Sequence, residues 1–163
     1  MFGHWRFVAL FDEVAPDLGG PERSALATVV ERVSGWGETV AVAPQVVCHG
    51  DVHPGNVLMS ADGPVVIDWD MVCAAPAAWD HAALLTWEER WGGTPGLYAS
   101  FAAGYGLDLR DDPLATVLAE GRLLAATLMR CRAGRTDPAA ADEARRRLRY
   151  WLGDPAAPVW RAA

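Results

Sequence analysis

One stretch of the chain interrupts a pattern that otherwise favours helices, and it constrains the fold more than any other feature. Two short apolar runs, 57–59 and 65–67, flank the turn-forming segment 60–64, which contains an Asp-Gly pair. Apolar runs on either side of such a turn are typical of a β-hairpin. The preceding segment, 49–56, is rich in Gly and Pro and is predicted to be a loop. We therefore expect a loop followed by one hairpin.

The segments before this loop carry mostly helical signals. The first apolar residues recur at helical intervals: Phe2, Trp5, Val8 and Phe11. A second helix is predicted to begin at Pro21, a favoured first-turn residue, and to stop near Gly35. The run 39–47 is rich in β-prone residues, although Pro44 interrupts it, so we expect an extended segment there.

Beyond Pro76 the pattern is helical to the end of the chain. Apolar periodicity marks three helices, over 84–91, 114–128 and 141–151. Asp137 and Pro138 precede the last of these as a natural N-cap and first-turn residue. The arginine-rich run 145–149 on this helix is expected to be a solvated face paired with nearby carboxylates.

Polar side chains gather in the loop and around the predicted hairpin. They are His49, Asp51, His53, Asn56, Asp68 and Asp70. A hairpin would return the chain so that Asp68, after the second strand, approaches Asn56, before the first. An amide oxygen and a carboxylate brought together in this way suit Mg²⁺. Asp51, near the other end of the loop, can then orient or deprotonate a hydroxyl group. A metal pair and such a carboxylate together suggest phosphoryl transfer.

The order of these residues matches a phosphotransferase pattern. His49-Gly50-Asp51, four further residues and Asn56 fit H-x-D-x-x-x-x-N, and Ile67-Asp68-Trp69 follows. The strings CHGDVHPGNVL, VVIDWD and PAAWDHA resemble the aminoglycoside phosphotransferase and choline kinase-like family over 47–85. The resemblance implies an α+β, mainly α-helical fold, namely a protein-kinase-like C-terminal lobe. Its catalytic loop would span 47–58, and its metal-binding hairpin 56–70.

The resemblance also implies roles for individual residues. Asp51 would be the catalytic base or the carboxylate that orients the acceptor hydroxyl. Asn56 and Asp68 would hold the Mg²⁺ ions that bridge the phosphates of ATP or another nucleoside triphosphate.

Other motif residues would support the loop rather than react. His49 and His53 would brace it, although His53 could instead line the acceptor pocket. Asp80 would cap a helix and tie it to the loop backbone. Asp70 would either accept a supporting hydrogen bond beside the metal or be a solvated turn carboxylate.

The sequence also departs from the family. All 14 basic residues are arginine, so the lysine that grips nucleotide phosphates in complete members is missing. No glycine-rich phosphate loop precedes His49. We therefore expect residues 1–163 to be a single domain, the C-terminal lobe without an N-terminal nucleotide lobe, whether as a truncated product, a fragment or half of a split enzyme.

Three functions are compatible with these residues. The first is ATP-dependent phosphoryl transfer to a hydroxyl of a small antibiotic-, choline- or sugar-like molecule. The second is a catalytically inactive lobe that acts as a pseudoenzyme or partner subunit. Its exposed apolar surface would be covered by a second copy or by a separate N-terminal lobe. The third is a divalent-metal hydrolase that uses His49, Asp51 and His53 as ligands, although only His81 follows as a further histidine.

Composition limits the partners and the compartment. A net charge of −7 excludes a general nucleic-acid binder and favours, weakly, a cationic acceptor. No apolar run is long enough to span a membrane. The three cysteines, Cys48, Cys73 and Cys131, form no CxxC pair and predict no disulfide framework. We therefore expect a cytoplasmic protein with no membrane partner.

Overall fold

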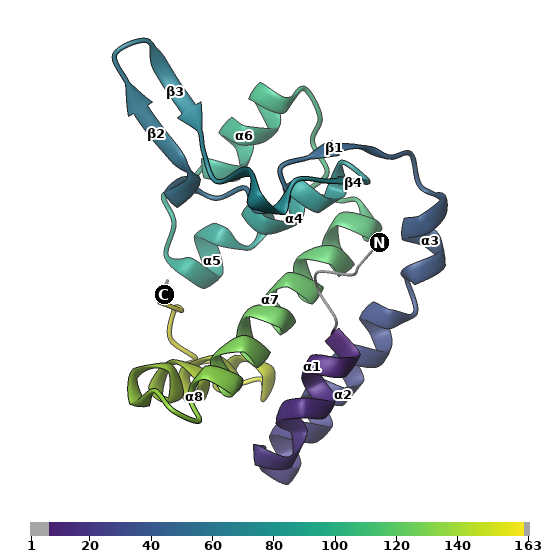
Figure 1. Cartoon of the computed structure of the whole chain (residues 1–163), viewed down its shortest axis with the longest axis vertical. Helices are drawn as coiled ribbons and strands as arrows, with labels where there is room; N and C mark the ends of the chain where they lie inside the picture. The colour runs from purple at the N-terminus through teal and green to yellow at the C-terminus, as the bar shows by residue number, and fades with distance from the viewer. Residues whose placement is uncertain (1–6, 162–163) are drawn as a thin grey trace. The chain divides into compact units, whose positions relative to one another are not determined.

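The computed structural model describes residues 7–161, which divide into two compact units. The first unit combines the N-terminal segment through Gly37 with the segment from Glu120 onward, and the second is Glu38–Ala119. The elements of both are labelled in Figure 1. They are mainly helices, with two small antiparallel sheets in the second unit, in agreement with the expected α+β class. Within residues 7–161, no helix combines the length and apolar character needed to cross a membrane.

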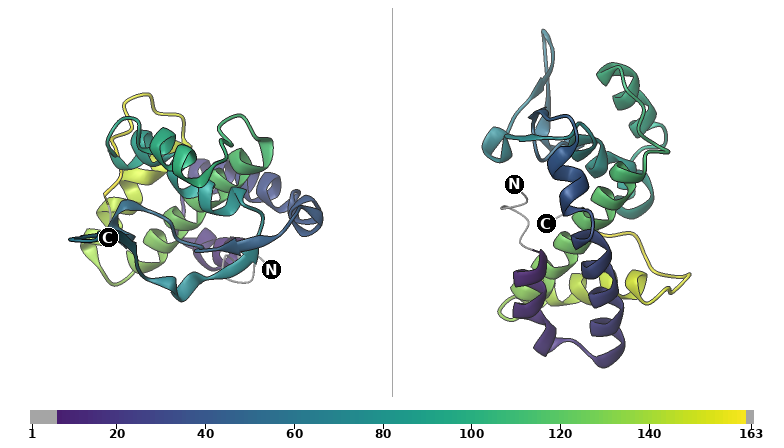
Figure 2. Two further views of the ribbon diagram at one scale, coloured as in Figure 1. Left: turned by 90° about the horizontal axis from the view of Figure 1, so that it is seen from above. Right: turned by 90° about the vertical axis from the view of Figure 1, so that its right-hand side faces the viewer.

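The first unit begins with two helices that pack against each other, α1 (Phe7–Val14) and α2 (Gly20–Ser34), joined by the short 3₁₀ helix η1 (Ala15–Asp17). Figures 1 and 2 both show α1 and α2 side by side. In α1 the buried side chains are Phe7 and Val14, seven residues apart on one helix face, whereas Val8 is exposed. The prediction that Val8 lies on the buried face of this helix is therefore wrong. Phe2 and Trp5 lie outside the described residues.

The second helix was predicted more accurately. It ends at Ser34 with Gly35 as its C-cap, as expected. Its buried residues recur at helical spacing: Leu26, Val29, Val30 and Val33. Within this unit Gly121 lets α7 (Pro113–Ala133) approach closely, since a Cβ there would lie 3.1 Å from Val33 Cγ1 and 3.3 Å from Phe7 Cζ.

The last helix, α8 (Pro138–Trp151), begins as predicted, because the Asp137 carboxylate accepts a hydrogen bond from the Ala139 N–H at 2.9 Å. Its arginines do not form one solvated face. Arg147 is 2% exposed, and its Nε lies 2.9 Å from Glu143 Oε1. Its other guanidinium nitrogens donate to the carbonyls of Ala126 and Arg161, each at 2.8 Å. The expectation of a wholly solvated arginine run is therefore wrong at Arg147.

The strands of the second unit form two separate pairs. Strand β1 (Val46–Cys48) pairs antiparallel with β4 (Cys73–Ala75), and β2 (Val57–Ser60) pairs antiparallel with β3 (Gly63–Val66). The second pair is the predicted hairpin, with Val57 opposite Val66. Strand β4 was not predicted, because its partner β1 is 25 residues or more away along the chain.

The same unit also contains helices. They are α3 (Gly37–Val42), α4 (Ala78–Leu85), α5 (Trp87–Trp91) and α6 (Leu97–Tyr105), together with the start of α7 and the short 3₁₀ helices η2 (Pro54–Asn56) and η3 (Trp69–Met71). Leu84, Tyr98 and Ala102 form a buried cluster between α4 and α6, and Val52 of the loop packs against it. The loop is thus anchored in the helical core of its own unit.

Two local predictions fail in this unit. The segment expected to be extended over 39–47 is helical through Val42, and only 46–48 are a strand. Helix α3 buries Val40, and the Gln45 side-chain amide donates to the Val40 and Ala43 carbonyls at 3.0 and 2.7 Å. These bonds satisfy carbonyls that a helix end leaves open, which outweighs the weak β-propensity. The helix predicted over 84–91 is divided at Thr86 into α4 and α5.

Candidate active site

The candidate site begins where β1 ends, and a buried carboxylate from α4 holds its first residues. Asp80 lies in the first turn of α4, where Ala77 is the N-cap, so the prediction that it caps the helix is wrong. It is 4% exposed. Its Oδ2 accepts from the His49 N–H at 2.9 Å and its Oδ1 from the Gly50 N–H at 2.8 Å. Hydrogen bonds to an ionised acceptor are stronger than neutral ones. Both oxygens of one carboxylate therefore bind consecutive backbone donors of the loop.

The ring of His49 links the loop to the end of the hairpin. Its Nε2 lies 2.8 Å from the Ile67 carbonyl oxygen, and its Nδ1 accepts from the Asp51 N–H at 3.2 Å. Because a carbonyl only accepts, Nε2 carries the ring proton and Nδ1 the lone pair. The ring also packs against Trp69, with centroids 4.6 Å apart. Neither ring nitrogen is left to bind a metal, which argues against the hydrolase interpretation.

Gly50 is required by its surroundings. Its φ is +90°, a conformation that side chains disfavour, and a Cβ there would overlap the Met71 carbonyl oxygen. The loop backbone thus lies directly against η3, which follows the hairpin. The sequence pattern identified the glycine, but not the segment that makes it necessary.

Asp51 and His53 lie close together within the loop. The Asp51 side chain is 37% exposed, and its Oδ2 is 3.6 Å from His53 Nε2. His53 Nδ1 accepts from the Gly55 N–H at 3.1 Å, so Nε2 carries the proton and faces the carboxylate. The His53 ring stacks on Trp87 of α5, with centroids 5.2 Å apart and planes 2° from parallel. Sequence reasoning did not place Trp87 beside the loop, because no local pattern connects them.

Asn56 and Asp68 lie at the base of the hairpin. Asn56 is 7% exposed, its side-chain Nδ2 donates to the Asp51 carbonyl at 3.0 Å, and its own carbonyl accepts from the Ile67 N–H at 2.9 Å. Asp68, which follows Ile67, is exposed and has φ 63° and ψ 62°. Among residues 7–161 it is the only non-glycine residue with positive φ. Such strain costs about 1–3 kcal/mol and is frequent at functional sites.

The side chains of these two residues offer the atom types that the predicted oxygen-ligand pair requires. The amide nitrogen of Asn56 is engaged, so Oδ1 is the atom it can offer, and Asp68 offers an exposed carboxylate. Asp70, in η3, is also exposed. In the part of the chain that the structure describes, no group of three or more His, Cys, Asp or Glu side chains is placed to hold a metal ion. An Asn-Asp pair would share Mg²⁺ with substrate phosphates instead.

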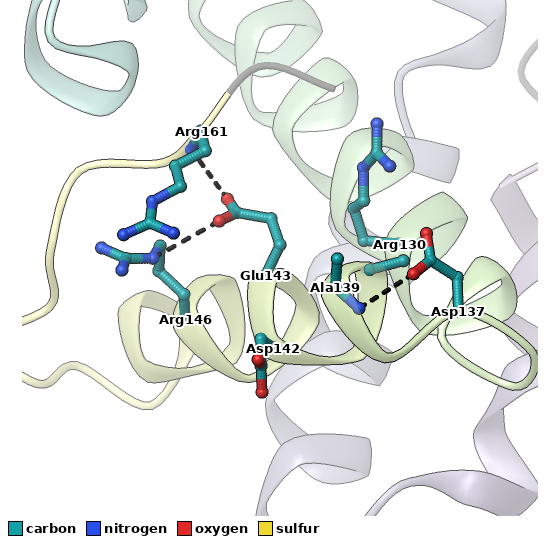
Figure 3. A pocket seen from close by; sticks show the side chains of 8 residues that line it. Arg130, Asp137, Ala139, Asp142, Glu143, Arg146 and Arg161 are labelled. Atoms are coloured by element: carbon teal, nitrogen blue, oxygen red, sulfur yellow. Dashed lines mark hydrogen bonds and ion pairs between the residues drawn. The ribbon is translucent and has the colours of Figure 1, made fainter.

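A cavity lies in the first unit, and none of the predicted site residues lines it. Its volume is about 390 Å³, and Figure 3 shows its charged lining. The lining charges are Arg130, Arg146 and Arg161 with Asp137, Asp142 and Glu143. Glu143 is already engaged by Arg146, Arg147 and the Arg161 N–H. This cavity is a balanced set of charges rather than a catalytic constellation.

Comparison with known families agrees with the site. A model of the phosphotransferase enzyme family matches residues 4–115, a segment that includes the loop, the hairpin and Asp80. The chain therefore belongs to the phosphotransferase enzyme family. Comparison with curated proteins gives no significant match, and comparison with solved structures gives none either.

Proposed function

We propose that this phosphotransferase moves the γ-phosphoryl group of ATP to a hydroxyl of a small molecule, with Asp51 as the residue that receives or orients the hydroxyl proton. The observation that carries the proposal is the hydrogen-bonded unit formed by the loop and the hairpin base. Asp51 and Asn56 are joined through the Asn56 amide, and His49 spans from Asp51 to Ile67. Phosphoryl transfer depends mainly on positioning and electrostatics, which such a unit supplies.

Each residue has a defined part in this proposal. The Asp51 carboxylate accepts the hydroxyl proton while the acceptor oxygen bonds to phosphorus and the bond to the leaving phosphate oxygen breaks. The His53 Nε2–H, 3.6 Å from Oδ2, steadies that carboxylate. Asn56 and Asp68 would hold Mg²⁺, which would neutralise charge on the phosphates. Asp80 keeps the loop backbone in place through its two hydrogen bonds.

The acceptor is proposed from charge alone. A net charge of −7 supports a cationic hydroxyl compound over an anionic one, because opposite charge raises the local concentration of a ligand. Aminoglycoside-like and choline-like alcohols meet this description, and neutral sugars serve as the comparison class.

A second function is supported by apolar surface on the hairpin. We propose, as the alternative, that the chain is an inactive lobe that works with a partner. The hairpin exposes apolar side chains on both strands, among them Leu58 (54% exposed), Met59 (78%) and Val65 (48%). Such surface favours a covering chain, either a second copy or a separate nucleotide-binding lobe.

Ligand-dependent stability distinguishes the two functions. The melting temperature is measured with Mg²⁺ alone and with Mg²⁺ plus ATP at millimolar concentration. Specific binding to the native state must raise it. A rise with both ligands, followed by labelled-phosphate transfer to an aminoglycoside or to choline, supports the enzyme. No rise in either condition contradicts autonomous transfer and supports the partner function.

Variants then test the assigned residues. Asp51→Asn and Asp68→Ala are expected to abolish transfer without changing the melting temperature of the unliganded protein by more than a few degrees. Asp62→Asn, at the exposed hairpin turn, is the matched control and should transfer phosphate normally. Turnover in Asp51→Asn equal to that of the control would overturn the assignment.

A further inference from the structure

Two cysteines that are far apart in sequence face each other in the fold. Cys48 ends β1 and Cys73 begins β4, and the antiparallel register pairs them directly. Directly opposed residues in an antiparallel pair have Cα atoms about 4.5–5.5 Å apart and project their side chains to the same face. Disulfides span Cα separations of about 4.4–6.8 Å. The backbone of this strand pair is therefore already within the range that a disulfide requires, although both cysteines are present as thiols.

The two thiols differ in access. Cys48 is completely buried and Cys73 is half-buried. The Cys48 Sγ donates to the carbonyls of Pro76 and Ala75 at 3.4 and 3.6 Å, so its thiol points along β4. Burial, followed by the negative charge of Asp80, raises the pKa of Cys48 to about 12. A reagent in solution therefore meets Cys73 first, and Cys48 reacts only from within the protein.

We propose that Cys48 and Cys73 form a site of reversible disulfide modification, with a low-molecular-weight disulfide such as oxidised glutathione as the oxidant. The Cys73 thiolate attacks one sulfur of the oxidant, its S–S bond breaks, and one glutathione thiolate leaves. The Cys48 thiolate then attacks the Cys73 sulfur of this mixed disulfide and displaces the second glutathione. Two protein thiols are oxidised, the oxidant is reduced to two thiols, and the two protein protons pass to the departing thiolates.

The position of this pair gives the modification a consequence. His49, Gly50 and Asp51 follow Cys48 directly, and η3 ends two residues before Cys73. A disulfide would join the strand that leads into the candidate catalytic loop to the strand that leaves the candidate metal segment. The third cysteine, Cys131, lies in α7 in the other unit and takes no part. The chemistry does not depend on phosphoryl transfer, so it can be tested even if that function is wrong.

The test uses the full chain with Cys131→Ser, which leaves only the two cysteines of interest. The native protein is equilibrated in glutathione buffers of graded redox ratio, quenched with acid and analysed by intact mass. We expect a product lighter than the reduced protein by two hydrogen atoms, with no accessible thiol after denaturation. The disulfide of the native chain should withstand a ratio of reduced to oxidised glutathione about tenfold higher than the ratio that reduces it in the urea-denatured chain. The reason is that the strand pair holds the two thiols together.

Mapping the bond requires a suitable protease. No arginine or lysine lies between Arg32 and Arg90, so trypsin leaves both cysteines on one peptide. A protease that cleaves at acidic residues can cut between them at Asp51, Asp62, Asp68 and Asp70, and it releases a cross-linked pair of peptides. Cys48→Ala should stop at a glutathione adduct on Cys73, whereas Cys73→Ser should resist the reagent because Cys48 is buried.

Several results would overturn the proposal. They are an unreacted native protein, a stable adduct on Cys73 while Cys48 is present, a disulfide between two chains, or a native disulfide no more stable than the denatured one. A Cys48–Cys73 bond formed in the native chain supports it.

Discussion

Removing the Asp80 carboxylate should release the start of the candidate catalytic loop. Two N–H groups, those of His49 and Gly50, donate to its oxygens at 2.9 and 2.8 Å in a buried environment. Each buried donor left without a partner costs about 1–3 kcal/mol, so Asp80→Ala should lower the free energy of unfolding by about 2–6 kcal/mol. That is a large part of the 5–15 kcal/mol typical of a domain. Asp80→Asn retains one acceptor oxygen and restores at most one of the two bonds.

Urea denaturation measures the loss of global stability in Asp80→Ala, and amide hydrogen exchange measures the loss of local stability at the loop. Exchange at His49 and Gly50 should accelerate at least tenfold, because each 1.4 kcal/mol of lost local stability is about a factor of ten. Asp70→Ala is the matched control, since that carboxylate is exposed, and it should change stability by no more than about 0.5 kcal/mol. Unchanged protection of both amides in Asp80→Ala would refute the reasoning.

Three further perturbations test other parts of the structure. In urea denaturation, Gly50→Ala should destabilise the protein by about 1 kcal/mol or more beyond the loss in Gly106→Ala. Both glycines have positive φ, but of the two only Gly50 lies against another backbone segment. Equal losses of stability in the two variants would contradict this close approach. Arg147→Met should cost about 3–5 kcal/mol, because it removes a buried ion pair with Glu143 and leaves the Ala126 and Arg161 carbonyls without their guanidinium donor. The exposed Arg145→Met should cost less than about 1 kcal/mol. Burial lowers the pKa of His81 below its ordinary value, so the native state resists protonation. Stability should therefore fall as the pH drops below about 6.5, the pKa in the unfolded chain, and His81→Phe should reduce that slope when urea midpoints are compared from pH 7 to pH 5.

Local signals in the sequence were sufficient for the hairpin and for the start of α8. The Asp-Gly turn between apolar runs predicted β2 and β3, and Asp137 caps its helix as expected. Both features depend on residues within a few positions of one another. The prediction of an extended segment over 39–47 failed where α3 forms, because β-propensity is weak and the Gln45 side chain bonds carbonyls at the end of this short helix.

The candidate site shows the same division. The sequence pattern identified Asp51, Asn56 and Asp68 by type and spacing, and residues 4–115 match the phosphotransferase enzyme family. It could not show that Trp87 stacks on His53 or that η3 lies against Gly50, because these contacts join segments that no local periodicity connects.

The sequence by itself thus determined the chemistry that the chain can offer: carboxylates, an amide and histidines in the order of a phosphotransferase loop, and no lysine. Only the tertiary structure decided how these groups are held. Asp80 reaches the loop from 30 residues away, and Cys73 comes opposite Cys48 through the pairing of β1 with β4. The physical reason is that hydrogen-bond partners and strand register follow from the packing of distant segments, whereas turns and caps follow from neighbouring residues.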